Sequence, residues 1–223
     1  MTRLAVFDVD GTLLDSRLII DAAMRAAFEA VGAPPPSYDE TRKIVGLSLI
    51  PAIKQLAPTL PETQWNALSE AYTAAFISMR DSGQAEALYA GARECVLALK
   101  EDGWLVGIAT GKARRGVEKF LDTHGFRDVF DAAFCADDGP GKPDPHMLRL
   151  NMEAVGMAPD ATVMIGDTSF DMEMARAAGA YAIGVGWGFH TIDEVTAGGA
   201  HVLAEDFVDL NAHLAHWRTS EPA

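Results

Sequence analysis

Two acidic residues follow an apolar run close to the start of the chain. The stretch AVFDVDGTLLDS, residues 5–16, places Asp8 and Asp10 two residues apart, immediately before Gly11. Two carboxylates about 4 Å apart repel each other by roughly 4 kcal/mol at an effective dielectric near 20. Side chains two residues apart on a strand leave from the same face. We therefore expect both carboxylates to face one site, which must also supply positive charge.

Further polar residues stand at or just beyond the ends of other apolar runs. Thr110 ends WLVGIAT, Lys142 lies in the loop GPGKPDP, and Asp167 ends ATVMIGD, with Asp171 four residues further on. Taken singly, Thr110 or Asp167 can cap a helix and Lys142 can be a solvated charge. Ligands of open parallel sheets collect beyond the carboxyl ends of the strands. The joint occurrence of these polar residues at successive strand ends, in this order, favours one shared site.

These residue types are suited to phosphoryl transfer. An all-oxygen ligand set favours a hard divalent cation such as Mg²⁺, and no His or Cys accompanies the motifs as a zinc site would require. A cation held by Asp8 and Asp167, with Lys142 nearby, forms a pocket for a dianion. Phosphoryl transfer in such a pocket depends mostly on positioning and charge neutralisation. One aspartate can attack phosphorus, and a second carboxylate can move protons.

The elements that must position these residues alternate between strand and helix. Strands are expected over residues 3–9, 104–110, 129–135, 161–167, 180–186 and 201–203, with helices over 91–103, 113–125, 145–156, 169–179 and 206–217. Apolar strands alternating with helices predict a parallel sheet covered on both faces. Between residues 15 and 88 only helical patterns occur, over 17–32, 38–57 and 62–80. We predict an α/β fold: a Rossmann-like core domain, residues 1–15 and 88–223, with an inserted all-helical domain, residues 16–87.

Composition excludes some classes of partner. The formal net charge of −14 over 223 residues argues against a nucleic-acid partner, which requires a basic face. No apolar stretch reaches 18 residues, so no membrane partner is expected. The two cysteines, Cys95 and Cys135, form no disulfide framework. We expect a reduced, cytoplasmic protein that is a monomer or a homodimer.

Four motifs together resemble those of the haloacid dehalogenase superfamily of phosphatases. They are DVDGTLLDS, the Ala-Thr-Gly of residues 109–111, GKPDP and GDTSFDM, in that order. The helical block between the first two motifs resembles the helical cap of the branch that contains phosphoglycolate phosphatases and β-phosphoglucomutases. The later stretch GVGWGFHT, residues 184–191, is also similar to that branch. The resemblance implies a magnesium-dependent phosphatase acting on a small phosphorylated metabolite.

The resemblance also implies roles for the acidic residues. Asp8 corresponds to the nucleophile and is also a magnesium ligand. Asp10 corresponds to the general acid and base, and its backbone carbonyl reaches the metal. Asp167 corresponds to a direct ligand of Mg²⁺, and Asp171 supports the metal. The expected metal site is therefore Asp8, Asp10, Asp167 and Asp171.

The remaining motif residues correspond to positions that bind the phosphoryl group or shape the site. Thr110 hydrogen-bonds the phosphoryl group, and Lys142 offsets the charge of the nucleophile and the phosphate. Gly11 opens the turn from core to cap, and Gly111 lies beside Thr110 in the second motif. Gly46, in the cap segment VGLS, permits close approach of backbone to the substrate. Gly11, Gly46, Thr110 and Gly111 are the expected substrate-binding residues.

Sequence differences within the superfamily indicate which of its reactions this chain is expected to catalyse. Members that cleave carbon–halogen bonds lack the second aspartate of the first motif, so Asp10 favours phosphate chemistry. Mutases carry an arginine shortly after the cap glycine that Gly46 matches, whereas this chain has the apolar Leu49 in that segment. Hydrolysis of phosphoglycolate or a sugar phosphate through an aspartyl phosphate is therefore favoured. A β-phosphoglucomutase-type enzyme and a non-catalytic phosphate-binding regulator remain as alternatives.

The helical block itself gives weaker signals. Trp65, Tyr72 and Phe76 recur at helical spacing and are expected in the core of the cap rather than around a substrate. Lys112, two residues after Thr110, can contact either a phosphate or the start of the following helix. The basic residues of the block are expected on solvated helix faces: Arg17, Arg25, Arg42, Lys43, Lys54 and Arg80.

Overall fold

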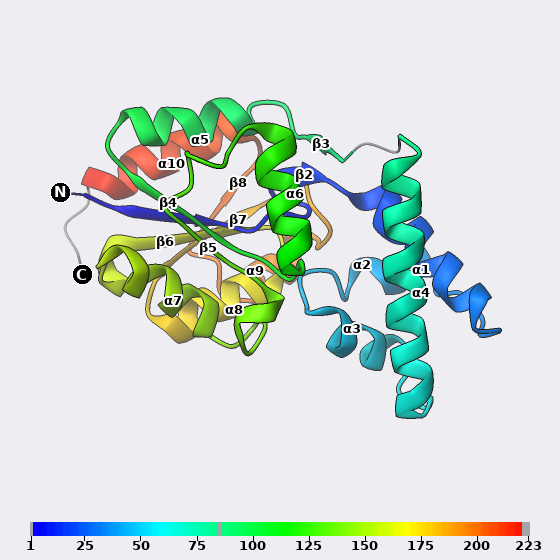
Figure 1. Ribbon diagram of the computed structural model, residues 1–223. Helices are drawn as coiled ribbons and strands as arrows, with labels where there is room; N and C mark the ends of the chain where they lie inside the picture. Colours follow the sequence, from blue (N-terminus) through cyan, green and yellow to red (C-terminus); the bar gives the residue numbers. More distant parts are fainter. Residues whose placement is uncertain (1, 84–85, 220–223) are drawn as a thin grey trace.

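A six-stranded sheet forms the centre of the larger lobe. The computed structural model describes residues 2–83 and 86–219 (Figure 1). The strands are β1 (Leu4–Phe7), β4 (Leu105–Ala109), β5 (Ala132–Phe134), β6 (Thr162–Gly166), β7 (Tyr181–Val185) and β8 (Val202–Ala204). They lie in the order β5-β4-β1-β6-β7-β8, and every neighbouring pair is parallel. The α/β fold with an inserted helical cap, predicted from the sequence, is confirmed.

The central strand shows why its residues are apolar without alternation. Leu4 and Val6 pack into one hydrophobic cluster, and Ala5 and Phe7 pack into the cluster on the opposite face. All four are fully buried, as expected for a parallel strand covered on both sides. The carboxyl ends of β1, β4 and β6 lie side by side in the sheet, so the residues that follow them meet at one edge.

Helices cover both faces of this sheet. One face carries α5 (Ala92–Glu101), α6 (Arg114–His124) and α10 (Phe207–Thr219); the other carries α7 (His146–Val155), α8 (Ser169–Ala178) and α9 (Ile192–Ala197). Figure 1 shows α5 and α10 above the strands and α7 and α8 below them. The short helix α9 was missing from the sequence prediction, as were the 3-10 turns at Ala136–Asp138 and Pro159–Ala161. Six residues give too little apolar periodicity for a helix to be detected.

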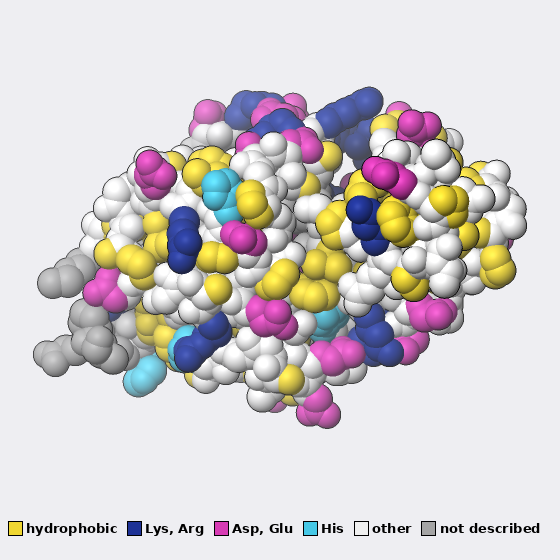
Figure 2. All heavy atoms as spheres, turned by 90° about the horizontal axis from the view of Figure 1, so that it is seen from below, with side chains coloured by type: hydrophobic (Ala, Val, Ile, Leu, Met, Phe, Trp, Pro, Cys, Tyr) yellow, Lys and Arg dark blue, Asp and Glu magenta, His cyan; other side chains and the backbone are white. Residues whose placement is uncertain are grey.

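The helices between the first and second motifs form the second lobe. They are α1 (Arg17–Ala30), α2 (Tyr38–Arg42), α3 (Leu49–Leu56) and α4 (Glu62–Asp81). Helices α1 and α4 pack along each other, and α3 packs against α4. Figure 2 shows the two lobes from below, with hydrophobic side chains visible where they meet. The lobe has its own hydrophobic cluster, which includes Ile20, Met24, Phe28, Ile53 and Leu68.

The predicted single helix over residues 38–57 is wrong. The structure instead has α2 and α3, separated by a turn at residues 43–48. Gly46 has φ of +98°, a left-handed conformation that ends an α-helix. Ser48 is extended (φ −63°, ψ 149°) at the N-terminus of α3. This break turns the backbone of residues 46–48 toward the sheet edge.

A small antiparallel ladder joins the two lobes. It consists of β2 (Leu14–Asp15) and β3 (Ala87–Leu88), which the sequence reading had not identified. Two-residue strands carry no readable periodicity, so their pairing depends on the tertiary fold. The division into residues 1–15 with 88–223 and residues 16–87 stays a prediction.

The structure also bears on the cysteines, on membrane-spanning helices and on the distribution of surface charge. Cys95 and Cys135 are both buried and unpaired. Within residues 2–83 and 86–219, no helix has the length and apolar character needed to cross a lipid bilayer. On the face drawn in Figure 2, acidic side chains are interspersed among the basic ones.

An ion pair links the two lobes at α2 and α9. Arg42 Nη1 lies 2.7 Å from Glu194 Oε2, and Arg42 also donates to the carbonyl oxygen of Phe189 at 3.4 Å. The Arg42 side chain is only 15% exposed, so the expectation that it lies on a solvated helix face is wrong. The Arg42 guanidinium lowers the pKa of Glu194 from its ordinary value of 4.5 to about 2. This pair favours the contact between the lobes while Glu194 is ionised.

We expect Glu194→Gln to lower the free energy of unfolding by about 1 kcal/mol at pH 7. The expected loss of stability is small because the Glu194 side chain is 32% exposed and water screens the ion pair. A carboxylate whose pKa is lowered by folding stabilises the fold above its unfolded pKa. The difference between wild type and variant should therefore be complete above pH 4.5 and shrink as pH falls toward about 2. Urea unfolding between pH 7 and pH 3 measures it.

A matched background separates this pair from the other bonds of Glu194. Glu194 also accepts hydrogen bonds from the backbone N–H and the hydroxyl of Thr191, in the capping box of α9. A glutamine at position 194 can accept the same hydrogen bonds. In an Arg42→Gln background, Glu194→Gln should change the free energy of unfolding by less than about 0.3 kcal/mol. An equal loss in both backgrounds would contradict the proposed coupling.

Candidate active site

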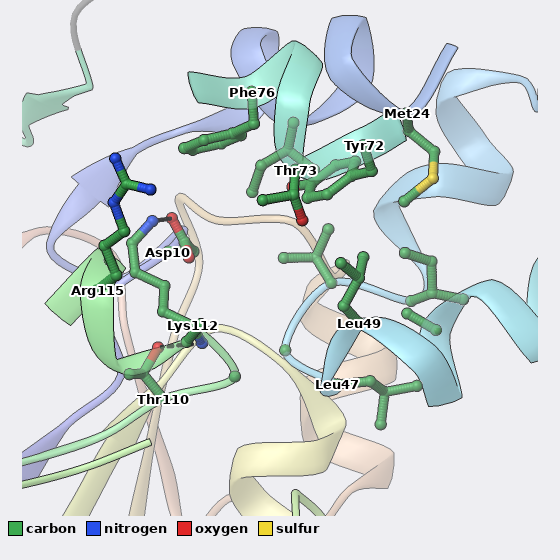
Figure 3. Close-up of a pocket in the computed structure, with 18 of the residues that line it drawn as sticks. Asp10, Met24, Leu47, Leu49, Tyr72, Thr73, Phe76, Thr110, Lys112 and Arg115 are labelled. Carbon is green, nitrogen blue, oxygen red and sulfur yellow. Dashed lines mark hydrogen bonds and ion pairs between the residues drawn. The ribbon is translucent and has the colours of Figure 1, made fainter. Parts of the chain in front are cut away.

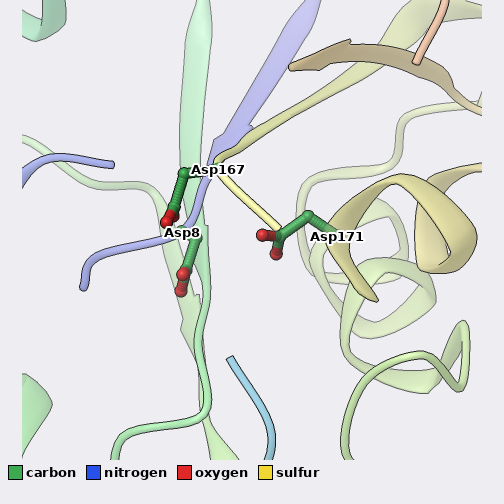
Figure 4. Close-up of side chains that lie close together, drawn as sticks. All are labelled: Asp8, Asp167 and Asp171. Atoms are coloured by element: carbon green, nitrogen blue, oxygen red, sulfur yellow. The ribbon is translucent and has the colours of Figure 1, made fainter. Parts of the chain in front are cut away.

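Three buried carboxylates converge at the edge of the sheet. Asp8 follows β1, Asp167 follows the neighbouring strand β6, and Asp171 lies in the first turn of α8. Each offers one oxygen that lies within 4.8 Å of the oxygens offered by the other two. Figure 4 shows the three side chains close together at the ends of their elements. All three residues are at most 1% exposed. The structure thus brings together three of the four residues predicted to hold a metal.

One lysine lies between two of these carboxylates. Lys142 Nζ is 2.8 Å from Asp8 Oδ1 and 2.6 Å from Asp171 Oδ1. Burial alone would lower the pKa of Lys142, but the charges of Asp171 and Asp8 raise it above its usual value. Lys142 is therefore charged at neutral pH. With Asp8, Asp167 and Asp171 ionised, one ammonium group leaves the cluster with a formal charge of −2.

The remaining negative charge perturbs the acids themselves. Burial raises the pKa of Asp8 to about 6, against the opposing effect of Lys142 and with a further rise from the charge of Asp171. Burial, with the charges of Asp8 and Asp171, also raises the pKa of Asp167 well above its ordinary value. Asp8 Oδ2 is buried and has no hydrogen-bond partner among the described residues. An orphaned carboxylate oxygen within an acidic, all-oxygen group fits a hard divalent cation.

Asp167 is held by groups from two other segments. Thr12 Oγ1 donates to Asp167 Oδ1 at 2.7 Å, and the backbone N–H of Phe189 donates to Asp167 Oδ2 at 2.8 Å. A Cβ on Gly11 or Gly188 would overlap the Asp167 side chain, and Gly11 has φ of +83°. Phe189 and Gly188 were not predicted as site residues. Their only signal was the resemblance of GVGWGFHT to the phosphoglycolate phosphatase branch.

The two carboxylate oxygens of Asp171 make different contacts. Its Oδ2 accepts from the backbone N–H and the hydroxyl of Thr168, at 3.1 and 2.7 Å, forming the capping box of α8. Its Oδ1 faces Lys142. The helix cap therefore fixes the carboxylate in the orientation that contacts the lysine.

A cavity opens beside the acidic cluster, between the two lobes. Its volume is about 200 Å³, and Asp8, Asp10, Gly46, Thr110 and Gly111 are among the residues that line it. The other predicted site residues do not line the cavity: Gly11, Lys142, Asp167 and Asp171. Asp8 is thus the residue that belongs both to the acidic cluster and to the cavity.

Gly11 was predicted to bind substrate, but the structure gives it another contact. Its backbone N–H donates to the carbonyl oxygen of Leu14 at 2.8 Å. The residue does not line the cavity. Its positive φ and its proximity to Asp167 show that a glycine is needed there for the turn and for the close approach.

Asp10 is paired with a lysine that the sequence reading left unassigned. Lys112 Nζ lies 2.8 Å from Asp10 Oδ1, and Figure 3 marks this ion pair. The same Nζ atom lies 2.8 Å from Glu86 Oε1. The Asp10 carboxylate lies outside the cluster of Asp8, Asp167 and Asp171. The two acids of the first motif therefore have separate cations, Lys142 for Asp8 and Lys112 for Asp10. No local pattern linked residues 10, 86 and 112.

The loop at residues 46–48 contacts the core loops closely. A Cβ on Gly111 would lie 2.7 Å from the carbonyl oxygen of Leu47 and 2.8 Å from that of Gly46. A Cβ on Gly46 would lie 3.0 Å from Thr168 Oγ1. The Thr110 hydroxyl accepts from the Lys112 backbone N–H at 3.3 Å and is buried at the cavity wall. Gly46 and Gly111 thus permit the close contact of cap and core around Thr110.

This fold and this group of acids define a class of protein, in which buried carboxylates lie at the carboxyl ends of parallel strands of an α/β fold, beneath a helical cap. Residues 5–185 match the family described as haloacid dehalogenase-like hydrolase. The chain belongs to that family.

Similar proteins agree with this assignment. A probable phosphatase, IndB, of Dickeya dadantii is 32% identical over 212 residues, covering 94% of this chain and 92% of that protein. A phosphoglycolate phosphatase of Pseudomonas putida is 28% identical, covering 92% of this chain and 77% of that protein. The crystal structure of a hydrolase from Pseudomonas syringae superposes with a TM-score of 0.86 at 27% identity, over 96% of this chain and 99% of that one. The predicted membership of this superfamily, as a phosphatase, is confirmed.

Proposed function

We propose that the protein hydrolyses small-molecule phosphate monoesters with Mg²⁺, through a phosphate ester of Asp8. The observation that carries this proposal is the buried group of Asp8, Asp167, Asp171 and Lys142 directly beside a cavity. Its formal charge of −2 is suited to a divalent cation, and the cavity gives a substrate access to Asp8. The phosphatase-like relatives support the same reaction class.

In this mechanism Asp8 attacks the phosphorus atom of the bound ester. A carboxylate oxygen of Asp8 forms the new bond to phosphorus as the bond from phosphorus to the alcohol oxygen breaks. Lys142 contacts Asp8 through its Nζ atom and offsets negative charge on the nucleophile and on the phosphoryl group. The Thr110 hydroxyl, buried at the cavity wall, donates a hydrogen bond to a phosphoryl oxygen.

Asp10 moves the proton in both half-reactions. It protonates the departing alcohol oxygen, and it then takes a proton from the water that attacks the phosphate on Asp8. Asp10 lines the same cavity as Asp8, and Lys112 fixes its side chain through the 2.8 Å contact. The products are the free alcohol and inorganic phosphate, and Asp8 is regenerated.

The side chains of Asp8 and Asp167 would hold the metal, with Asp171 supporting it and Asp10 contributing its backbone carbonyl. When bound, Mg²⁺ supplies positive charge that stabilises the phosphoryl oxygens during transfer. Thr12 and the Phe189 N–H hold Asp167 in place for this role. We place the reaction in the cytoplasm, on a free metabolite rather than a nucleic acid or membrane, with the protein a monomer or homodimer.

A panel of phosphate monoesters tests the proposal. With 5 mM Mg²⁺ (on the order of a saturating concentration for carboxylate sites), phosphate should be released from at least one of p-nitrophenyl phosphate, phosphoglycolate and glucose 6-phosphate. Excess EDTA should abolish the release. No release from any member in Mg²⁺ would contradict the function and would favour a non-catalytic phosphate-binding protein.

Magnesium is expected to raise the melting temperature as well as the activity. A ligand at about 100 times its Kd adds roughly 2.7 kcal/mol to the free energy of unfolding. For a chain of this length that corresponds to a rise of about 5–10 °C in the melting temperature.

Asp167→Asn should remove most of this rise, because it removes one anionic ligand. An Asp193→Asn control, on the exposed surface of α9, should retain it; an equal rise in both variants would contradict the metal assignment. Differential scanning fluorimetry with Mg²⁺ or EDTA measures the shift.

A phosphomutase is the second candidate and makes a different product. The side chain at the position where mutases carry arginine is Leu49, which lines the cavity. An apolar side chain there cannot hold the second phosphate of a bisphosphate intermediate. With β-glucose 1-phosphate we expect glucose and phosphate as products. Formation of glucose 6-phosphate would identify a mutase instead.

A further inference from the structure

The cavity beside Asp8 has two chemically different walls. The core wall is polar and carries Asp8, Asp10, Thr110 and Lys112. The opposite wall comes from α1, α3, α4 and the segment between α2 and α3. Most of its side chains are apolar, and its polar members are Tyr72, Thr73 and Arg80. Figure 3 shows Met24, Leu49 and Tyr72 facing Asp10 and Lys112 across the cavity. A phosphate ester with its phosphoryl group at Asp8 would place its alcohol against this apolar wall.

We propose, on the basis of the phosphatase function above, that the alcohol released from the substrate is apolar and carries a ring. A hydroxyl or carboxylate placed against Met24, Leu47 and Leu49 would lose hydration without gaining a hydrogen bond. An apolar group gains from the same burial, by about threefold to fourfold in binding for each methylene. An apolar cavity of about 150 Å³ accommodates benzene, so a cavity of about 200 Å³ is of the size needed for one ring beside the phosphoryl group.

Two aromatic side chains give this wall its shape. Tyr72 and Phe76 lie one turn apart on α4, with ring centroids 5.9 Å apart, and both line the cavity. Lys112 Nζ lies 5.3 Å from the centroid of Phe76 and thereby positions that ring beside the polar wall. The sequence predicted that both residues pack in the core of the cap, and this is only part of their role. Both rings pack against the cap cluster, and both also line the cavity. Trp65 differs: its indole N–H donates to the Ala57 carbonyl, and it does not line the cavity.

The cations around the cavity do not favour a carboxylate on the substrate. Lys112 is neutralised by Asp10 and Glu86. Arg80 forms an ion pair with Asp81, with 3.2 Å between Nη2 and Oδ1. Arg115 is exposed at the rim and has no ion pair within the part of the chain that the structure describes. Among these cations Arg115 is the one without an ion pair in the described residues, so it is the group expected to meet the carboxylate of phosphoglycolate, and that compound is the alternative to exclude.

A substrate series with similar leaving groups tests the proposal. Ethyl, n-butyl and 2-phenylethyl phosphate release alcohols of nearly equal acidity, so differences in kcat/KM reflect binding of the alcohol rather than its reactivity. We expect kcat/KM to rise along the series, with 2-phenylethyl phosphate at least about 30-fold above ethyl phosphate. It should also exceed phosphoglycolate and glucose 6-phosphate. A higher kcat/KM for phosphoglycolate, lost in Arg115→Gln, would overturn the proposal, as would a flat series.

Variants of the aromatic wall give a second readout. Phe76→Ala should lower the ratio of kcat/KM for 2-phenylethyl phosphate to that for ethyl phosphate about tenfold. Phe76→Leu keeps most of the apolar volume and protects the test against loss of folding; it should lower the ratio by a smaller factor. Leu18→Ala is the matched control, because Leu18 is apolar, 86% exposed on α1 and away from the cavity. An unchanged ratio in both Phe76 variants would overturn the assignment of this wall.

The outcomes distinguish failure of the inference from failure of the function. Release of phosphate from p-nitrophenyl phosphate in Mg²⁺, together with a flat alkyl series, leaves the phosphatase function standing and overturns the apolar substrate class. No release from any ester overturns both. A rising series that depends on Phe76 supports both.

Discussion

Replacement of Asp8 by asparagine is expected to lower kcat for phosphate-monoester hydrolysis at least about 10⁴-fold. Removal of an enzyme's nucleophile leaves only the contribution of binding and electrostatic stabilisation, and losses near 10⁶ are known for comparable substitutions. Asparagine has nearly the shape of aspartate, and Lys142 keeps its 2.6 Å contact with Asp171. The loss should therefore reflect chemistry rather than misfolding. Steady-state release of phosphate in Mg²⁺ measures it.

Asp193→Asn provides the matched control. Asp193 is exposed on α9 and lies outside the cavity, so the same change of charge there should leave kcat within about twofold. Retention of more than a few per cent of kcat by Asp8→Asn would assign the nucleophile elsewhere or indicate direct attack by water. Circular dichroism and the melting temperature should show that both variants are folded.

The covalent step can be observed directly. With a phosphorus-labelled ester, rapid acid quenching of the wild type should recover label on the protein, and hydroxylamine should release it, as expected for an acyl phosphate. Asp8→Asn should retain no label. Label that persists in Asp8→Asn would place the phosphoenzyme on another residue, whatever the steady-state rate.

The positions of the acidic residues could be predicted because they depend on chain direction. Asp8 and Asp167 each follow an apolar run, and parallel strands end at one edge of a sheet. The structure places β1 and β6 side by side, with Asp8 and Asp167 in one cluster. The four motifs added Lys142 and Asp171, which the structure joins through a 2.6 Å contact.

The partners of Asp10 could not be predicted in the same way. Lys112 and Glu86 lie 102 and 76 residues beyond Asp10, and their ion pairs are formed only when the linker at β3 lies beside the loop after β4. The position of Lys112 beside Thr110 pointed only to a phosphate or to the start of the following helix, and Glu86 stands in no pattern that distinguishes it from a solvated charge. Their contacts are a product of tertiary structure, which local periodicity does not contain.

The aromatic part of the cavity lining was missed for a different reason. The spacing of Tyr72 and Phe76 on α4 shows which face of the helix is covered, but not whether protein or a ligand covers it. Both residues pack partly against the cap cluster and partly border the cavity. Gly46 gave a related difficulty: a single glycine within a helical pattern is tolerated often enough that the break at residues 43–48 could not be recognised.

Asp10→Asn is expected to lower kcat for alkyl phosphates by about 10²–10⁴-fold, the usual contribution of a general acid or base. Asparagine cannot protonate the departing alkoxide or take a proton from water. Lys112 stays paired with Glu86 at 2.8 Å, so the variant should keep its local structure. The reaction should remain dependent on Mg²⁺, because the Asp10 carboxylate lies outside the group formed by Asp8, Asp167 and Asp171.

The leaving group separates the two roles of Asp10. p-Nitrophenolate departs without a proton, so formation of the phosphoenzyme from p-nitrophenyl phosphate should be slowed far less in Asp10→Asn than formation from ethyl phosphate. Attack by water still requires the base. The variant should therefore release about one equivalent of p-nitrophenol in a rapid burst and then turn over slowly, with label accumulating on Asp8. An equal loss of rate for both esters, with no burst, would show that Asp10 acts on binding or positioning and not on proton transfer.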